Sequence, residues 1–104
     1  MAIVTITKEN YDDIVIRGEK KVLLDFWAPW CAPCRMVGPI VEEIARERED
    51  IVVGKVNVDE ELELAREFGV ASIPTLVVLQ AGETLGTAIG YSPKEEILEL
   101  LERN

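Results

Sequence analysis

Residues 25–35 read DFWAPWCAPCR and join an apolar segment to an amphipathic one. Upstream, residues 21–27 are apolar on both alternations apart from Asp25, which is typical of a strand covered on both faces in a partly parallel sheet. Downstream, apolar residues recur at i, i+1, i+4, i+5, i+8 and i+9 from Met36, which predicts a helix with one apolar side. The sequence therefore places a Cys-X-X-Cys pair between the end of a central strand and the start of a helix.

The pair, Cys31 and Cys34, has the position that thiolate chemistry requires. The unpaired amide donors and positive dipole at a helix start favour an anion. We therefore predict that Cys31 lies beside solvent with its pKa lowered into the range of roughly 3.5 to 7.5 known for such sites. Cβ atoms three residues apart there are separated by about 5 to 6 Å, close to the about 3.5 to 4.5 Å of a disulfide. Cys31 would attack a substrate disulfide, and the deeper, less accessible Cys34 would resolve the mixed disulfide.

Two other interpretations of the pair are incidental thiols and half of a metal site. A zinc site needs about four protein ligands, and the chain has no His and no further Cys. Only a dimer sharing four thiolates, or carboxylates completing the shell, could build one, so we expect no metal. The absence of His also removes the commonest general base and every catalytic triad built on imidazole.

The rest of the chain continues an alternation of strands and helices. We predict strands over residues 3–7, 51–58, 75–80 and 84–89, and helices over residues 9–17, 59–68 and from 93 to the end. Asp59 is expected to cap the short helix and Gly69 to end it, while Ser92 and Glu95 form a capping box. Pro39 is expected to kink its helix without ending it. The order βαβαβαββα predicts an α/β fold with a mixed sheet and helices on both faces.

Length and charge limit the possible functions. The 104 residues predict a single domain over residues 1–104. Eleven Lys and Arg against 20 Asp and Glu give a net charge of −9, which disfavours nucleic acid as a partner. No run approaches the roughly 18 to 20 apolar residues of a membrane span, and the first ten residues, MAIVTITKEN, lack the features of a secretory leader. We expect a cytoplasmic protein.

The sequence resembles the thioredoxin family over essentially the whole chain. The resemblance rests on residues 25–35, on Pro39 and on the SIPT sequence of residues 72–75, and the element order matches throughout. It implies a thioredoxin fold with about five strands flanked by four helices. It also implies a general protein-disulfide reductase with no bound cofactor, recharged by an NADPH-dependent thioredoxin reductase. The expected partners are that reductase and disulfide-containing clients, and we expect a monomer that binds neither nucleic acid nor membrane.

The resemblance also assigns roles to residues behind the cysteines. Asp25 is a carboxylate in an apolar strand, where desolvation should raise its pKa. The matching aspartate of the family lies buried behind the second cysteine, so Asp25 would take the proton from Cys34 as that thiol becomes a nucleophile. Lys55 resembles the family lysine that pairs with this carboxylate. A partly exposed Asp25 and a solvated Lys55 are the alternatives.

The family pattern further implies a substrate surface around the pair. Ile73–Pro74 resembles the loop with a cis peptide bond beside the disulfide, where Ile73 would offer backbone hydrogen bonds to an extended substrate segment. Trp27 is expected to pack in the core near the site. The full set of expected substrate contacts is Trp30, Ala32, Pro33, Ala71, Ile73, Pro74 and Gly90.

The chain departs from the family between the cysteines, where Ala32-Pro33 replaces the commoner Gly-Pro. The local backbone is stiffer as a result, so the redox potential and the fit to a reductase could differ. Two alternatives to a general reductant follow. One is a dedicated oxidoreductase that serves one partner, and the other is a binding or accessory subunit that keeps the fold.

Overall fold

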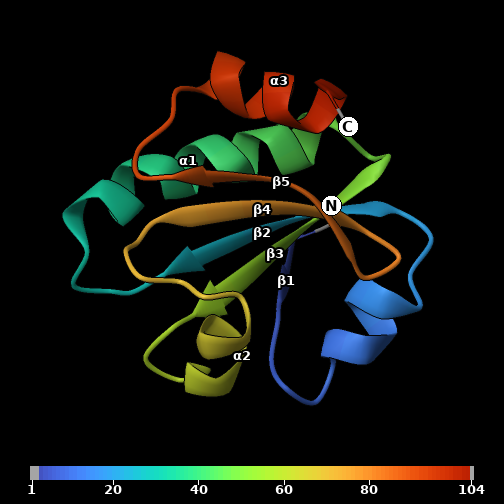
Figure 1. Ribbon diagram of the computed structural model, residues 1–104. Coiled ribbons are helices and arrows are strands. Elements are labelled where there is room, and N and C mark those ends of the chain that lie inside the picture. Colours follow the sequence, from blue (N-terminus) through green and yellow to red (C-terminus); the bar gives the residue numbers. More distant parts are fainter. Residues whose placement is uncertain (1–2, 104) are drawn as a thin grey trace.

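The computed structural model describes residues 3–103 and forms a mixed sheet with helices on both faces (Figure 1). In chain order the elements are β1 (Ile3–Thr5), the π-helix η1 (Asp12–Ile16), β2 (Lys21–Trp27), α1 (Ala32–Glu47), β3 (Ile51–Asn57), α2 (Leu62–Glu67), β4 (Thr75–Gln80), β5 (Glu83–Ile89) and α3 (Lys94–Arg103). The five strands lie in the order β1-β3-β2-β4-β5, with β3 parallel to β1 and β2 and with β4 antiparallel to β2 and β5. The predicted α/β fold and its element order are confirmed.

Strand β2 occupies the centre of the sheet because its apolar residues are covered on both sides. Residues 22–26 are all buried between helical layers. Leu23 packs with α1 and α3, whereas Leu24 and Phe26 pack in the opposite layer with α2 and η1. Figure 1 shows these helices on the two faces of the sheet. Since side chains alternate along a strand, Asp25 shares the face of Leu23 and points into the layer covered by α1.

Helix α1 begins at the cysteines and runs on through its internal proline. Cys31 is the N-cap residue, and the buried side chains include Cys34, Val37, Val41 and Ile44 at the spacing of one helix face. Pro39 lies inside the helix and is exposed, as expected of a residue on the solvent side that does not end the helix. The apolar face anchors α1 on the sheet and so fixes the position of its N-terminus.

Local hydrogen bonds move several element bounds away from the predicted ones. The first strand ends at Thr5 because the Thr7 amide donates to Asn10 Oδ1, which starts a turn, and the following helix is a π-helix limited to Asp12–Ile16. The prediction that Asp59 caps the short helix is wrong, since α2 begins three residues later with Glu61 as its N-cap. The other bounds differ by one residue or not at all. No helix within residues 3–103 is long and apolar enough to cross a bilayer.

Replacing Gly54 with alanine is expected to destabilise the fold. Gly54 lies in β3, where an added Cβ would come 2.7 Å from Ile6 Cγ1 and 2.8 Å from Leu24 Cδ2, and both of those side chains are fully buried. Overpacking of this kind costs about 1 to 3 kcal/mol, to be measured by urea denaturation. The control is Gly38→Ala, because a Cβ on Gly38 in α1 makes only an ordinary 3.5 Å contact and alanine favours the helix. Equal stability of the two variants would contradict the prediction.

Candidate active site

The two cysteines form a disulfide at the N-terminus of α1, with their Cα atoms 5.2 Å apart. Cys31 has extended backbone angles, and its Sγ accepts a hydrogen bond of 3.2 Å from the Cys34 amide. The sulfur therefore takes the place that an oxygen occupies in an ordinary N-cap. The start of a helix is a position at which backbone amides and the helix dipole stabilise negative charge.

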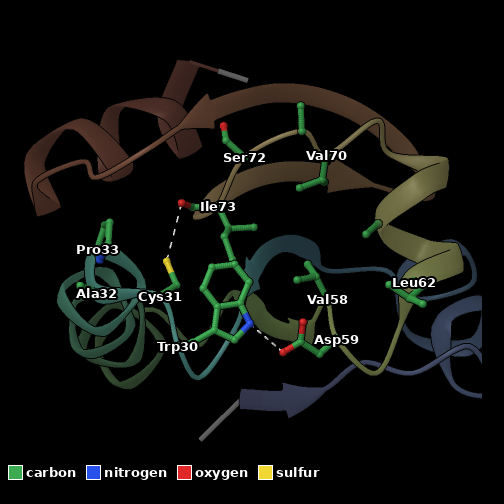
Figure 2. A pocket seen from close by; sticks show the side chains of 12 residues that line it. Trp30, Cys31, Ala32, Pro33, Val58, Asp59, Leu62, Val70, Ser72 and Ile73 are labelled. Atoms are coloured by element: carbon green, nitrogen blue, oxygen red, sulfur yellow. Dashed lines mark hydrogen bonds between the residues drawn. The ribbon is translucent and has the colours of Figure 1, made fainter.

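The two cysteines differ less in exposure than predicted. Cys31 is 5% exposed and Cys34 is 4% exposed, so Cys34 is the less accessible of the two, as predicted, but the difference is small and both residues are buried. Ala28, Val58 and Ile73 pack with the cysteine pair, and Cys31 Sγ lies 3.7 Å from the Ile73 carbonyl oxygen (Figure 2). The two cysteines differ in their position relative to the adjoining groove, because Cys31 lines it and Cys34 does not.

An apolar groove of about 590 Å³ opens beside Cys31. Figure 2 shows the Trp30 ring between Cys31 and Asp59, with the Ile73 side chain against it. Trp30 is 67% exposed, and its Nε1 donates a 2.9 Å hydrogen bond to Asp59 Oδ2. This bond holds the indole in place while its face stays open to solvent, as a rigid contact for a bound chain requires.

The structure brings most of the expected substrate contacts to this groove. Trp30, Ala32, Pro33, Ala71 and Ile73 line it.

The other two expected contacts, Pro74 and Gly90, lie next to the groove but do not line it. The Ile73–Pro74 peptide bond is cis, Pro74 is buried, and its carbonyl accepts a 2.8 Å hydrogen bond from the Gly90 amide. Gly90 has a φ of +86°, which favours glycine. Pro74 and Gly90 thus support the loop that presents Ile73.

The far wall of the groove was not predicted. It is formed by the β3–α2 connection, by α2 and by the loop before Ile73, with Val58, Asp59, Leu62, Ala65, Val70 and Ser72 as lining residues. One sequence signal pointed to part of it. Because β2 and β3 are parallel, the residues after their carboxyl ends meet at one edge of the sheet, which brings Val58 and Asp59 towards the cysteines.

Asp25 is fully buried, on the face of the sheet that α1 covers. Burial raises the pKa of its carboxyl group, the Lys55 ammonium opposes that rise, and the charge of Glu42 adds to it. Lys55 Nζ lies 3.3 Å from Asp25 Oδ2. Within residues 3–103 neither carboxylate oxygen has a hydrogen bond of good geometry, so Lys55 acts on Asp25 as an ion-pair partner. A carboxyl group in this setting is suited to accepting a proton.

One face of α1 connects Cys34 to this buried carboxyl group. Cys34, Gly38 and Glu42 follow one another at intervals of four residues and so lie on the same side of the helix. A Cβ on Gly38 would meet Lys55 Nζ at 3.5 Å, and Glu42 Oε2 lies 3.8 Å from the same atom. This face therefore covers the Asp25–Lys55 pair, with Cys34 one turn away. No group of three or more potential metal ligands gathers anywhere in the described part of the chain.

Comparison with known proteins gives a consistent result. A model of the thioredoxin family matches residues 2–103. The chain is 45% identical over 105 residues to the thioredoxin of Bacillus subtilis (strain 168), covering 100% of this chain and 99% of that protein. It is 45% identical over 104 residues to the thioredoxin of Pyropia yezoensis, with 99% and 97% covered. It is 52% identical over 87 residues to the thioredoxin of Listeria monocytogenes serovar 1/2a, with 83% and 84% covered.

Proposed function

The chain belongs to the thioredoxin family and is a dithiol-disulfide oxidoreductase that reduces protein disulfides, and on this premise we propose that Cys31 is its nucleophile and Cys34 its resolving thiol. The observation that carries this assignment is the 3.2 Å hydrogen bond from the Cys34 amide to Cys31 Sγ. A donor at the helix N-terminus stabilises negative charge on the first sulfur and not on the second. The first sulfur also lines the groove.

The reaction transfers two electrons in two exchange steps. The Cys31 thiolate attacks one sulfur of the client disulfide, and the other client sulfur leaves as a thiolate that takes up a proton. Cys34 then loses its proton and attacks Cys31 Sγ in the mixed disulfide, which releases the second client thiolate. The client ends as a dithiol and the protein as the Cys31–Cys34 disulfide.

Asp25 is the proposed proton acceptor for Cys34 in the second step. Its burial and raised pKa suit a general base that works near neutral pH. Lys55, 3.3 Å from the carboxylate, stabilises the ionised form that exists before each transfer.

The groove is the proposed binding site for the client segment that carries the disulfide. Its apolar lining and the fixed Trp30 ring provide contact area without selecting one side chain. Ile73 lies in the loop before β4, beside Cys31, where its backbone is placed to pair with an extended client segment. Ala32, Pro33 and Ala71 would contact the segment, and Pro74 and Gly90 would hold the loop.

The electron source follows from the family. Thioredoxins act without a bound cofactor and work with thioredoxin reductase and disulfide clients. For this chain we expect an NADPH-dependent thioredoxin reductase as donor and many disulfide proteins as clients. We further expect it to act as a cytoplasmic monomer made of one domain.

Coupled turnover tests this proposal. With a bacterial thioredoxin reductase, NADPH and insulin, the protein should consume one NADPH for each insulin disulfide reduced. Dithiothreitol in place of the reductase and NADPH is the control for the dithiol chemistry alone. A protein that reduces insulin with dithiothreitol but is not reduced by any thioredoxin reductase would contradict the general electron source and favour a dedicated oxidoreductase.

A further inference from the structure

Glu42 lies beside the proposed proton acceptor but has no part in the reaction described above. It sits two helical turns after Cys34 on the same face of α1. Its Oε2 is 3.8 Å from Lys55 Nζ. The side chain of Glu42 is 47% exposed, against 18% for Lys55 and 1% for Asp25. From Glu42 through Lys55 to Asp25, the three charged groups thus become progressively more buried.

The Lys55 ammonium interacts with both carboxylates. It lies 3.3 Å from Asp25 and 3.8 Å from Glu42, and it stands 5.4 Å from the centre of the Trp27 ring. The ammonium lies against α1 at Gly38, where a Cβ would meet it at an ordinary contact distance of 3.5 Å. One ammonium can form ion pairs with two carboxylates at once, because the attraction between opposite charges does not require a hydrogen bond to each. Asp25 therefore does not hold the charge of Lys55 alone.

We propose that Glu42 is a positioning residue that shares the Lys55 ammonium with Asp25 and so keeps Asp25 available as a proton acceptor for Cys34. If Lys55 paired with Asp25 alone, the carboxylate would be stabilised and would become a weaker base. Glu42 opposes this in two ways, by drawing the ammonium towards solvent and by adding negative charge nearby. The inference rests on the proposed role of Asp25.

Among the residues that the structure describes, the charged groups that act on Asp25 are Lys55 and Glu42. Strand β3 contributes Lys55, and α1 contributes Glu42 and the titratable Cys34. On the other side, β4 places Leu76 opposite Asp25 in the strand register. Among these neighbours, Glu42 is the one whose charge can be removed at the surface without opening the core.

Titration of Asp25 by NMR in the oxidised protein tests the proposal directly. The Asp25 carboxyl carbon is followed from about pH 4 to about pH 10 in wild type, Glu42→Gln and Glu43→Gln. Glu43 is the matched control, because it neighbours Glu42 but pairs with Lys94 of α3. We expect the titration midpoint of Asp25 to fall by about half a pH unit in Glu42→Gln and to stay unchanged in Glu43→Gln. Glu42→Asp keeps the negative charge, so it should reverse at least half of the fall in the Asp25 midpoint that Glu42→Gln causes.

Three outcomes overturn the proposal. The first is a midpoint in Glu42→Gln equal to that of wild type, and the second is an equal shift in Glu43→Gln, which would indicate only a change of net charge. The third is a shifted midpoint while the pH profile of insulin reduction stays the same, because Asp25 would then not be the acceptor. If Glu42→Gln still reduces insulin and its Asp25 midpoint equals that of wild type, the proposed role of Glu42 is wrong but the dithiol mechanism stands.

Discussion

Cys31→Ser will reduce the rate of insulin disulfide reduction to the uncatalysed background, a loss of at least about 10³-fold. A serine hydroxyl does not ionise near neutral pH, so the donors at the start of α1 have no thiolate to stabilise. The substitution is mild for the fold, because Cys31 is an N-cap residue and serine is among the best N-caps. The rate is measured by insulin turbidity with dithiothreitol, and a matching circular dichroism spectrum excludes unfolding as the cause.

Cys34→Ser will give the complementary result. The first exchange step remains, but the mixed disulfide has no resolving thiol and accumulates. Intact-mass analysis should find one client chain bound through Cys31, and peptide mapping should locate the link. Since Cys34 does not line the groove, Cys31→Ser should trap no client through Cys34. Client bound to Cys34 in that variant would reverse the assigned roles.

Asp25→Asn is expected to slow turnover at neutral pH by about 10- to 100-fold. Asparagine has nearly the same shape and burial but cannot take up the Cys34 proton, so the resolving step loses its base. The mixed disulfide should then decay slowly in single-turnover experiments while its formation stays fast. A variant slow in the first step and normal in the second would contradict this account.

Asp25→Asn should also change how the free energy of unfolding depends on pH, and the raised pKa of Asp25 determines the direction of that change. Burial raises the pKa of Asp25 above the ordinary 3.8 that applies in the unfolded chain. Between the two pKa values the folded protein keeps the proton and the unfolded chain loses it, so the free energy of unfolding of wild type falls as pH rises. Each unit of difference is worth about 1.4 kcal/mol.

Asp25→Asn lacks this cost, so its stability relative to wild type should grow from about pH 4 upwards and level off once wild-type Asp25 has ionised in the folded state. Urea denaturation of both proteins over this range measures the difference. Stability curves that run parallel with pH would show that Asp25 has an ordinary pKa and would remove the basis for its role.

The fold was largely predictable because its central elements are defined by their own residues. Strand β2 and strand β4 were predicted with their observed bounds, since each is a mostly apolar segment that is followed by turn residues. The early helix was not, because a side-chain hydrogen bond at Thr7 and the unusual π-helical turns of η1 override the apolar spacing. Asp59 failed as a cap because its carboxylate binds Trp30 from another part of the chain.

The site, like the fold, has a part that could be predicted from the sequence and a part that could not. The cysteines and Asp25 lie within eleven residues, so a local motif identifies them. The wall formed by Leu62 and Val70 depends on how α2 packs beside the loop before Ile73, and no spacing in the sequence encodes that contact. The low exposure of Cys31 has in part the same origin, because Val58 and Ile73, which pack with the cysteines, come from distant segments.

The central claim is that Cys31 and Cys34 interconvert as one pair between dithiol and disulfide, with a potential suited to reducing other proteins. The measurement is equilibration in glutathione and dithiothreitol buffers of graded potential, followed by acid quench, alkylation and intact-mass analysis. We predict molecules with both cysteines alkylated or neither, almost none with one, and a midpoint more reducing than the cytosolic glutathione pool. Two alkylated cysteines at every potential, or a midpoint far on the oxidising side, would contradict the account.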